Sequence, residues 1–359
     1  MYCKRIIYKN FRNIEQADIE LSCGVNIFYG NNAEGKTNAL EGLYLFANGK
    51  SFRGQSDKDL INFNSNIGNL KMYFDDSVRD HEMEIKLSRL GRKTCYRNGV
   101  NIKKISDFVG YFRSVLFCPE HLSVIKDGPS ERRSFLDGAI CQLKPIYLSA
   151  LQKYNNILSQ RNILIKNYEE DKETFDRTIG LWSAYLAREA ALISRERFEY
   201  VKMLDGHVRD FFSDMTGGRE NTKIEYNCLM TEQEYYKKLT ENLEKEINAG
   251  TTLYGTHKDD IDISLNGREA RAFCSQGQQR SLALAMKMGE GEISKQMTGE
   301  YPVFLFDDIF SELDSHRKDY VMNGIKGKQV IITSCERDSI ENASSACFEV
   351  NKGVYTRVK

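Results

Sequence analysis

The sequence VNIFYGNNAEGKT, residues 25–37, is the most informative stretch for the fold of this chain. It begins with a short apolar run typical of a buried strand and continues as a match to the pattern G-x-x-x-x-G-K-[ST]. From Thr37 to about Ala47, apolar residues recur at the spacing of a helix. A glycine-rich loop between a strand and a helix turns its backbone N–H groups toward phosphate oxygens. The segment therefore predicts a phosphate-binding loop.

Most residues of this loop have a predicted role. Lys36 would reach the β- and γ-phosphates of ATP, and the Thr37 hydroxyl would ligate Mg²⁺. Ala33 stands where glycine is common, so a positive φ at this position would carry a cost. A chance glycine loop is the alternative, and the strand and helix on either side argue against it. The predicted ATP-binding residues of the loop are Gly30, Asn31, Asn32, Ala33, Glu34, Gly35, Lys36 and Thr37.

A second motif supplies the carboxylates that such a loop needs. Val303–Phe306 is an apolar run, and Asp307 and Asp308 follow it. Asp307 would hold Mg²⁺, directly or through water, and Asp308 would orient or deprotonate the attacking water. An acidic pair after a strand is also a common helix N-cap. Together with the phosphate loop, the pair favours a Mg²⁺-dependent ATPase with Lys36 and Asp308 as catalytic residues.

A third motif, SQGQQ at residues 275–279, begins a predicted helix. Free N–H groups and the helix dipole make such a terminus an anion site, although an ordinary N-cap is a common alternative. The order of phosphate loop, serine-glycine turn and acidic strand favours the anion site. The predicted phosphate-contacting residues of this turn are Ser275, Gln276, Gly277 and Gln278.

The composition argues against several classes of protein. The chain has 359 residues, 41% of them hydrophobic and 28% charged, so it can bury a core. Lysine plus arginine equals aspartate plus glutamate at 51 each, so a nucleic-acid surface would require local segregation of charge. The nine cysteines include no CxxC pair, which argues against a zinc site and fits a reducing cytoplasm. No signal segment or long apolar run indicates export or a membrane span.

Two kinds of pattern alternate along the chain. Strand patterns dominate the N-terminal part and return in the C-terminal part, whereas the middle is charged and helical. In the C-terminal part, the apolar runs Val303–Phe306 and Gln329–Thr333 predict buried parallel strands, and Asn266-Gly267 predicts a hairpin between Ile261–Leu265 and Arg268–Phe273. The helical apolar stripe breaks at Glu169–Thr174, which predicts an antiparallel pair of helices. This pair would form an arm or simply a helical domain with its own core. We expect an α/β head at residues 1–128 and 249–359, with a helical lobe that carries a short arm inserted at 129–248.

Together these motifs resemble the RecF family of bacterial recombination and gap-repair ATPases, which are related to the heads of chromosome-maintenance proteins. The resemblance spans nearly the whole chain. Many ATPases share the phosphate loop and the acidic strand, whereas SQGQQ and two of the segments between these motifs occur in a much smaller set of proteins. The matching segments are NFRN at 10–13, TNALE at 37–41, FCPEHL at 117–122, RRSFLD at 132–137, GTHKDD at 255–260, SQGQQR at 275–280 and DDIFSELD at 307–314.

The resemblance implies an ABC-type P-loop ATPase head with a mostly helical second lobe inserted. It also implies weak, DNA-stimulated hydrolysis and ATP-dependent dimerisation. Arg12 and Asn38 would join the ATP-binding residues, and Glu120 would join the Mg²⁺ ligands where such heads usually have glutamine. The SQGQQ turn would contact the γ-phosphate bound by the other subunit. The loop that lines the same dimer interface would be Ser311, Glu312, Leu313 and Asp314.

Partners and a cellular role are implied as well. The partners are DNA, as duplex and as single-strand/double-strand junctions, and the RecR and RecO mediator proteins that help to load recombinase in the cytoplasm. Asp308 is a methylene shorter than the glutamate usual in ABC heads, which predicts slow hydrolysis. Thr333-Ser334 stands where transporters keep a histidine. His257 and Lys258 suggest no mechanism of their own, and capping of the adjacent strand is one role open to them.

A basic stretch is the candidate DNA surface. Residues 86–104 carry seven basic side chains and no acidic one, around a hairpin predicted at Asn98-Gly99. Such a hairpin can follow phosphates without reading bases, and a solvated strand face is the alternative. The resemblance favours DNA. The candidates are Arg92, Lys93, Arg97, Lys103 and Lys104, with Lys50, Arg53 and Lys58 as a weaker second group.

Three other functions can be weighed against this one. The nucleotide-binding subunit of a transporter would keep the switch histidine and would follow the membrane on fractionation. A chromosome-tethering protein would need arms far longer than residues 147–203 allow. A nuclease fused to an ABC head would need a further acidic cluster or metal-ligand spacing. The sequence therefore favours an ATP-gated DNA-binding switch.

Overall fold

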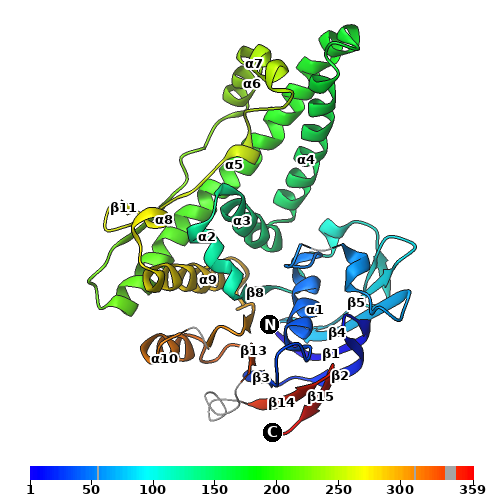
Figure 1. Cartoon of the computed structure of the whole chain (residues 1–359), viewed down its shortest axis with the longest axis vertical. Coiled ribbons are helices and arrows are strands. Elements are labelled where there is room, and N and C mark those ends of the chain that lie inside the picture. The colour runs from blue at the N-terminus through cyan, green and yellow to red at the C-terminus, as the bar shows by residue number, and fades with distance from the viewer. Residues whose placement is uncertain (55, 311–312, 336–344) are drawn as a thin grey trace. The chain divides into compact units, whose positions relative to one another are not determined.

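The computed structural model describes residues 1–54, 56–310, 313–335 and 345–359 (Figure 1). They form two compact units, Met1–Leu122 with Arg280–Lys359, and Ser123–Gln279. The first unit holds the phosphate loop and the acidic strand, and the second holds the helical lobe. Residues 249–279, which the sequence patterns grouped with the head, lie in the second unit because β10 (Asp262–Leu265) pairs with β9 (Thr222–Glu225).

A mostly parallel sheet of the first unit has the strand order β15-β14-β3-β13-β12-β8. Every residue of β8, β12 and β13 is buried, as expected for parallel strands that are covered on both faces. The predicted buried strands at Val303–Phe306 and Gln329–Thr333 are thereby confirmed. The bounds are β3 Val25–Tyr29, β8 Ser114–Phe117, β12 Val303–Asp307, β13 Val330–Ser334, β14 Ala346–Asn351 and β15 Val354–Arg357.

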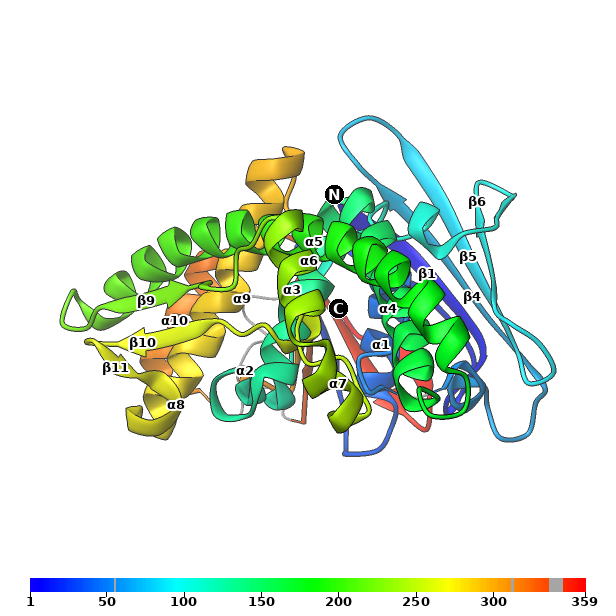
Figure 2. The ribbon, with the colours of Figure 1, turned by 90° about the horizontal axis from the view of Figure 1, so that it is seen from above.

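A second sheet of this unit is antiparallel, with the order β2-β1-β4-β5-β6-β7. Figure 2 labels β1, β4, β5 and β6 of this sheet. Burial alternates along β4 and β5, so each strand has one face in the core. Asn98 and Gly99 have φ of 48° and 77°, the positive values that a type I′ turn requires, and they join β6 to β7 as predicted. The bounds are β1 Tyr2–Phe11, β2 Ile14–Glu20, β4 Ile67–Asp75, β5 Asp80–Ser88, β6 Thr94–Arg97 and β7 Val100–Ile102.

One apolar core joins α1 (Lys36–Asn48) to both sheets. Leu43 of the helix belongs to the same buried cluster as Leu70 of β4 and Leu305 of β12. The Tyr8 hydroxyl of β1 donates a hydrogen bond of 2.7 Å to the carbonyl oxygen of Ala39 in the helix. Because α1 starts at the phosphate loop, this packing fixes the direction in which the loop leaves the sheet. The unit also contains α9 (Gln276–Thr298) from Arg280 onward and α10 (Ser315–Gly324).

The second unit is mostly helical. Figure 1 shows α4 and α5 running side by side, which confirms the predicted antiparallel pair, and α6 lies along α5. The predicted stripe of α4 is buried at Tyr147, Tyr154, Arg161 and Ile165. The bounds are α2 Ser123–Lys126, α3 Pro129–Leu143, α4 Pro145–Lys166, α5 Lys172–Thr216, α6 Glu232–Glu241 and α7 Leu243–Ala249.

Arg161, the charged residue among these buried positions of α4, forms a buried ion pair. Arg161 and Glu246 are both 0% exposed, and Arg161 Nη2 lies 2.6 Å from Glu246 Oε2. Arg161 also donates to the hydroxyls of Ser183 and Thr252, and Glu246 Oε1 accepts from the Leu253 amide. Hydrogen bonds of this kind offset the desolvation of two buried charges.

One predicted strand is shorter than the sequence suggested. The expected hairpin around Asn266-Gly267 forms, with φ of 51° and 75° at the turn. The second strand, β11, covers only Arg268–Glu269, and Ala270–Phe273 forms the helix α8. The sequence Ala-Arg-Ala consists of strong helix formers, which explains why the strand stops there.

Candidate functional site

The phosphate loop occupies the turn between β3 and α1. Gly35 has φ of 114° and caps α1, and a Cβ atom there would lie 2.7 Å from Asn13 Oδ1. Gly30 has φ of 153°, and a Cβ atom there would lie 2.3 Å from the carbonyl oxygen of Val350. Both positions therefore require glycine. Ala33 has φ of 66°, so it carries the conformational cost that its place in the motif predicted.

Lys36 is held by its own loop. Its Nζ donates hydrogen bonds to the carbonyl oxygens of Gly30 at 2.6 Å and Asn31 at 2.8 Å, and it lies 3.7 Å from Cys335 Sγ. The residue is only 7% exposed. A buried positive charge therefore lies against the backbone turn that would cradle phosphates.

Other elements of the first unit brace the loop. Asn13 donates to the carbonyl oxygen of Ala33 at 3.4 Å and accepts from Asn38 Nδ2 at 2.8 Å. The Tyr355 hydroxyl of β15 donates to the carbonyl oxygen of Gly35 at 2.8 Å. Glu34 accepts from the backbone amide of Lys352. Glu34, predicted among the ATP-binding residues, is thus tied to the C-terminal strands.

Asp307, at the end of β12, meets the loop directly. Its Oδ1 accepts hydrogen bonds from the hydroxyls of Thr37 at 2.8 Å and Thr333 at 2.7 Å. Burial raises the pKa of Asp307 above its ordinary value, and the hydrogen bonds from Thr333 and Thr37 oppose that shift. The two predicted Mg²⁺ ligands, Thr37 and Asp307, therefore lie side by side.

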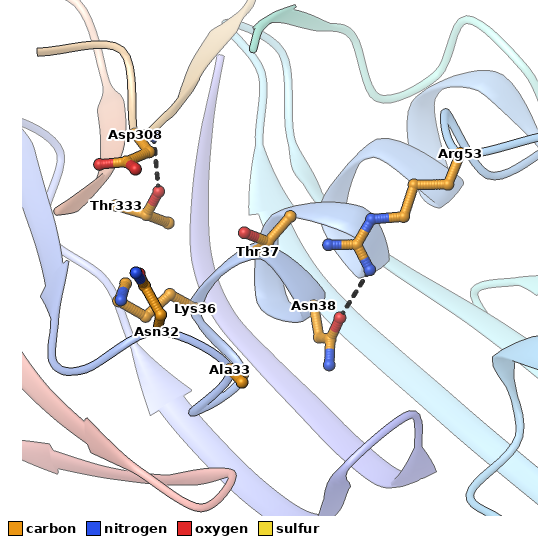
Figure 3. Close-up of a pocket in the computed structure, with 9 residues that line it drawn as sticks. Asn32, Ala33, Lys36, Thr37, Asn38, Arg53, Asp308 and Thr333 are labelled. Carbon is orange, nitrogen blue, oxygen red and sulfur yellow. Dashed lines mark hydrogen bonds between the residues drawn. The ribbon is translucent and has the colours of Figure 1, made fainter. Parts of the chain in front are cut away.

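Thr333 is a site residue to which the sequence motifs assigned no role. It lies in β13, next to β12, and its hydroxyl also accepts from the backbone N–H of Asp308 at 2.9 Å (Figure 3). Asp308 has φ of 50°, a strained value for a residue other than glycine. One threonine hydroxyl thus contacts both acidic residues of the motif. The strand pairing that brings Thr333 to Asp307 joins residues 26 positions apart, a separation that no local pattern detects.

Arg12 and Arg53 share a buried carboxylate, Glu41. Arg12 donates to both carboxylate oxygens, at 2.8 and 2.6 Å, and Glu41 is 0% exposed. Arg53 Nη1 lies 3.5 Å from Glu41 and donates to Asn38 Oδ1 at 2.9 Å. The sequence interpretation gave Arg53 only as a weak DNA candidate, yet it lines the pocket beside the phosphate loop (Figure 3). The role of Arg12 in ATP binding stays a prediction.

A cavity of about 180 Å³ collects most of these groups. Its lining joins the phosphate loop and the start of α1 to the ends of β12 and β13. The lining residues are Asn32, Ala33, Gly35, Lys36, Thr37, Asn38, Arg53, Asp308 and Thr333. Gly30, Asn31, Glu34 and Arg12 are not part of this lining. Glu120 is exposed in the turn Pro119–Leu122, and its charge contributes to the raised pKa of Asp307, after the larger effect of burial.

The donor atoms at Thr37 and Asp307 suit Mg²⁺, which binds few protein oxygens and completes its shell with phosphates and water. Among the described residues, no group of three or more His, Cys, Asp or Glu side chains is placed to hold a metal ion. A hydroxyl beside a single buried carboxylate is what a nucleotide-dependent magnesium site requires from the protein. The residues present therefore fit the predicted ion.

The SQGQQ turn lies in the second unit and caps α9. The Ser275 hydroxyl accepts from the Gln278 amide at 3.3 Å, and Gln278 Oε1 accepts from the Ser275 amide at 2.8 Å. The predicted helix start is thereby confirmed. Of the predicted interface loop, Ser311 and Glu312 lie outside the described residues. Leu313 is buried, and Asp314 caps α10 by accepting from the Arg317 amide.

Comparison with known proteins identifies the family. The model of the RecF/RecN/SMC N terminal domain matches residues 2–357. A DNA replication and repair protein RecF of Clostridium kluyveri is 37% identical over 366 aligned positions that cover both chains fully. The chain belongs to the RecF family. A DNA replication and repair protein RecF of Clostridium botulinum strain Okra is 38% identical, again over the full length of both chains.

Solved structures agree with this family and fold. A structure described as the recombination mediator protein RecF with ATP in the RecFOR pathway has a TM-score of 0.93 at 32% identity. That match covers 100% of this chain and 98% of the other. An Smc head bound to a domain of ScpA has a TM-score of 0.57 at 16% identity, covering 100% and 97%, and shows the fold alone. The ABC-type ATPase head predicted from the sequence is thus confirmed.

The basic stretch of this RecF-family chain divides into two groups. Lys93 donates to the carbonyl oxygen of Gly49 at 2.6 Å and to Asp57 at 2.9 Å. The guanidinium of Arg97 lies 3.8 Å from the centre of the Tyr111 ring. These two side chains have structural contacts. The exposed candidates are Arg92, Lys103 and Lys104.

Two segments of the family resemblance, residues 132–137 and 255–260, meet inside the second unit. Arg132 binds both carboxylate oxygens of Asp260, at 2.6 and 2.7 Å. Arg197 of α5 joins the blocks, because it donates to Asp137 at 2.8 Å and to Asp259 at 3.2 Å. These blocks therefore build the interior of the helical lobe.

His257 belongs to the same interior. Its Nδ1 lies 2.6 Å from the Tyr154 hydroxyl, and its Nε2 lies 3.1 Å from the carbonyl oxygen of Thr252. Burial lowers the pKa of His257 to about 4. A neutral, fully engaged histidine indicates a structural role.

Across the described part of the chain, no helix combines the length and apolar character needed to cross a membrane.

Proposed function

We propose that this chain binds ATP with Mg²⁺ in the cavity between the phosphate loop and the ends of β12 and β13, and that it hydrolyses ATP slowly. The observation that carries this proposal is the convergence of Thr37 and Thr333 on one oxygen of Asp307 beside Lys36. Membership of the RecF family, and the ATP complex of a full-length relative, support it.

Each side chain then has a separate task. Lys36 binds the β- and γ-phosphates through its buried ammonium group, and Thr37 and Asp307 would hold Mg²⁺. That ion would neutralise phosphate charge. Asp308 orients or deprotonates the attacking water. Its short side chain and its backbone constraint favour slow turnover, which suits a switch.

The SQGQQ turn completes the site of a second copy. Two heads that face in opposite directions would each present Ser275 and Gly277 to the γ-phosphate held by the partner's loop, with Leu313 and Asp314 at the same interface. Such an interface is isologous, so the dimer has two equivalent sites. ATP stabilises the dimer because it binds that state more tightly, and hydrolysis releases it.

DNA and mediator proteins are the proposed partners. The exposed Arg92, Lys103 and Lys104 would contact phosphates of duplex DNA and of single-strand/double-strand junctions without sequence specificity. A relative described in the RecFOR pathway supports RecR and RecO as partners in loading recombinase during recombinational repair and replication-gap processing. The proposed location is the cytoplasm.

Mixed dimers test the composite site. Lys36→Ala removes the phosphate charge and Gly277→Glu blocks the turn, so each variant alone should lack ATPase activity. A mixed dimer would contain one site with both defects and one with neither. Hydrolysis should return on mixing, at up to about half the wild-type rate if the two sites are independent.

Subunit exchange must be verified in the same samples, for example by two differently tagged chains recovered together. Verified mixed dimers that stay inactive would contradict the composite site. Coupling between the sites is tested separately by titrating wild-type chain into each variant, where independent sites give activity proportional to the number of intact sites.

A further inference from the structure

The cap of α9 depends on a residue outside the SQGQQ motif. Gln278 has both ends of its amide engaged, since Oε1 accepts from the Ser275 amide at 2.8 Å and Nε2 donates to Glu220 Oε1 at 2.6 Å. The Ser275 hydroxyl in turn accepts a hydrogen bond from the backbone N–H of Gln278 at 3.3 Å. Ser275 and Gln278 therefore form a reciprocal capping box, and Glu220 holds it from the side.

Glu220 determines which end of the Gln278 amide faces the serine. An ionised carboxylate can only accept hydrogen bonds, so it can pair with the amide NH₂ group and not with the amide oxygen. The oxygen must then point toward the Ser275 backbone N–H, which needs an acceptor. With Glu220 absent, only the Ser275 backbone N–H would orient the amide, and the Gln278 side chain would lose its second anchor.

We propose that Glu220 is a positioning residue for ATP hydrolysis. It fixes Gln278, and through Gln278 it fixes Ser275 and the N-terminus of α9. This inference rests on the proposed function, in which that terminus contacts the γ-phosphate bound by a second copy. A hydrogen bond to a charged acceptor is stronger than one between neutral groups, so a single carboxylate can set the geometry of the turn.

Glu220 also lies just after the C-terminal end of α5, one of the two paired helices α4 and α5. The helix α5 ends at Thr216, and Glu220 precedes β9. The adjacent Asn221 exchanges two hydrogen bonds with Asn266, at 2.8 and 2.7 Å, so this segment is tied to the turn between β10 and β11. A movement at this end of α5 would therefore reach the SQGQQ turn through Glu220.

Substitution of Glu220 separates positioning from nucleotide binding. Glu220→Ala should lower the DNA-stimulated kcat by about ten-fold, the effect of losing one charged hydrogen bond. Binding of a fluorescent ATP analogue to the monomer should not change, because the phosphate loop lies in the other unit. Glu220→Gln keeps an acceptor oxygen but loses the charge and gains a donor, so its rate should fall between those of the wild type and Glu220→Ala. The matched control is Glu225→Ala, which removes an acid of β9 paired with Lys223.

An exchange of the two side chains keeps the test decisive if one variant folds poorly. Gln278→Glu places two carboxylates against each other and should be slow. The double variant Glu220→Gln with Gln278→Glu restores a donor opposite an acceptor and should recover most of the rate. Recovery in the double variant supports positioning. Wild-type turnover by Glu220→Ala, or a double variant as slow as Gln278→Glu alone, would overturn it.

The same assays distinguish this inference from the composite site itself. If the composite site is wrong, Gly277→Glu hydrolyses ATP normally or its mixed dimers with Lys36→Ala stay inactive, whatever Glu220 does. If only the role of Glu220 is wrong, Gly277→Glu is inactive while Glu220→Ala turns over like the wild type. A loss of thermal stability shared equally by Glu220→Ala and Glu220→Gln, with equal loss of rate, would also overturn the positioning role.

Discussion

The predicted nucleotide cavity and the basic stretch at residues 86–104 differ in how well the structure agrees with the sequence patterns that predicted them. At the phosphate loop, Thr37 donates a hydrogen bond to Asp307 and Lys36 lies against the carbonyl oxygens of the loop, as their motifs indicated. In the basic stretch, Lys93 is bound to the carbonyl oxygen of Gly49 and to Asp57, and Arg97 packs on an aromatic ring, so part of the charge is used inside the unit.

The difference comes from what each pattern specifies. The phosphate-loop motif fixes backbone conformation, through glycines that no other residue can replace, and a side chain at a set distance from that turn. A count of basic residues does not specify where each side chain points or which group it contacts. A motif that encodes geometry therefore locates a site, whereas a composition only indicates where one could be.

The largest expected effect is on nucleotide binding. Lys36→Ala should weaken Mg-ATP binding by at least about a hundred-fold, because hydrogen bonds to a charged group contribute about 1.5–3 kcal/mol each. Titration with a fluorescent nucleotide measures it. Lys50→Ala, an exposed lysine just past α1, is the control and should bind normally. Unchanged affinity in Lys36→Ala would remove the phosphate-loop assignment.

The next effect is on turnover. Asp308→Asn should bind ATP normally and hydrolyse it about a hundred-fold more slowly, the usual contribution of a group that activates water. Single-turnover hydrolysis and size-exclusion chromatography would then reveal a persistent ATP-bound dimer. Glu15→Gln, on the exposed side of β2, should behave like the wild type. Normal turnover by Asp308→Asn would place the catalytic base elsewhere.

Thr333 tests a residue that the motifs did not assign. Thr333→Val removes the hydroxyl that Asp307 and the Asp308 amide share, with little change in shape, and should slow hydrolysis about ten-fold. Thr333→Ser keeps the hydroxyl and should retain most of the rate. Equal rates for the valine and serine variants would mean that the hydroxyl has only a packing role.

The smallest effect concerns DNA. Replacing Arg92, Lys103 and Lys104 by alanine should lower the slope of log K against log salt by about 0.9 for each phosphate contact that is lost. Lys93→Ala should instead lower thermal stability and leave the slope unchanged, because this lysine is bound within the unit. If Lys93→Ala changed the slope and the triple variant did not, Lys93 would contact DNA and the three exposed residues would not.

The contacts that the sequence interpretation did not assign share a physical cause. Thr333 reaches Asp307 because β13 pairs with β12, and Arg53 reaches the cavity because the chain folds back beside Glu41 after α1. Glu220 contacts Gln278 across 58 positions of sequence. Each contact is set by strand pairing or by packing of distant segments, so no local pattern could have predicted it.

Local sequence patterns were enough to predict the phosphate loop, the acidic strand, the capped start of α9 and both Asn-Gly hairpins. Each depends on local rules: positive φ at glycine or asparagine, continuous apolar runs for buried strands, and side chains that cap a helix. The folded chain was needed to see that Asp307 accepts from two threonine hydroxyls and that residues 249–279 belong with the helical lobe. Those outcomes depend on which distant segments pair and pack, and non-local contacts of this kind leave no periodic trace in the chain.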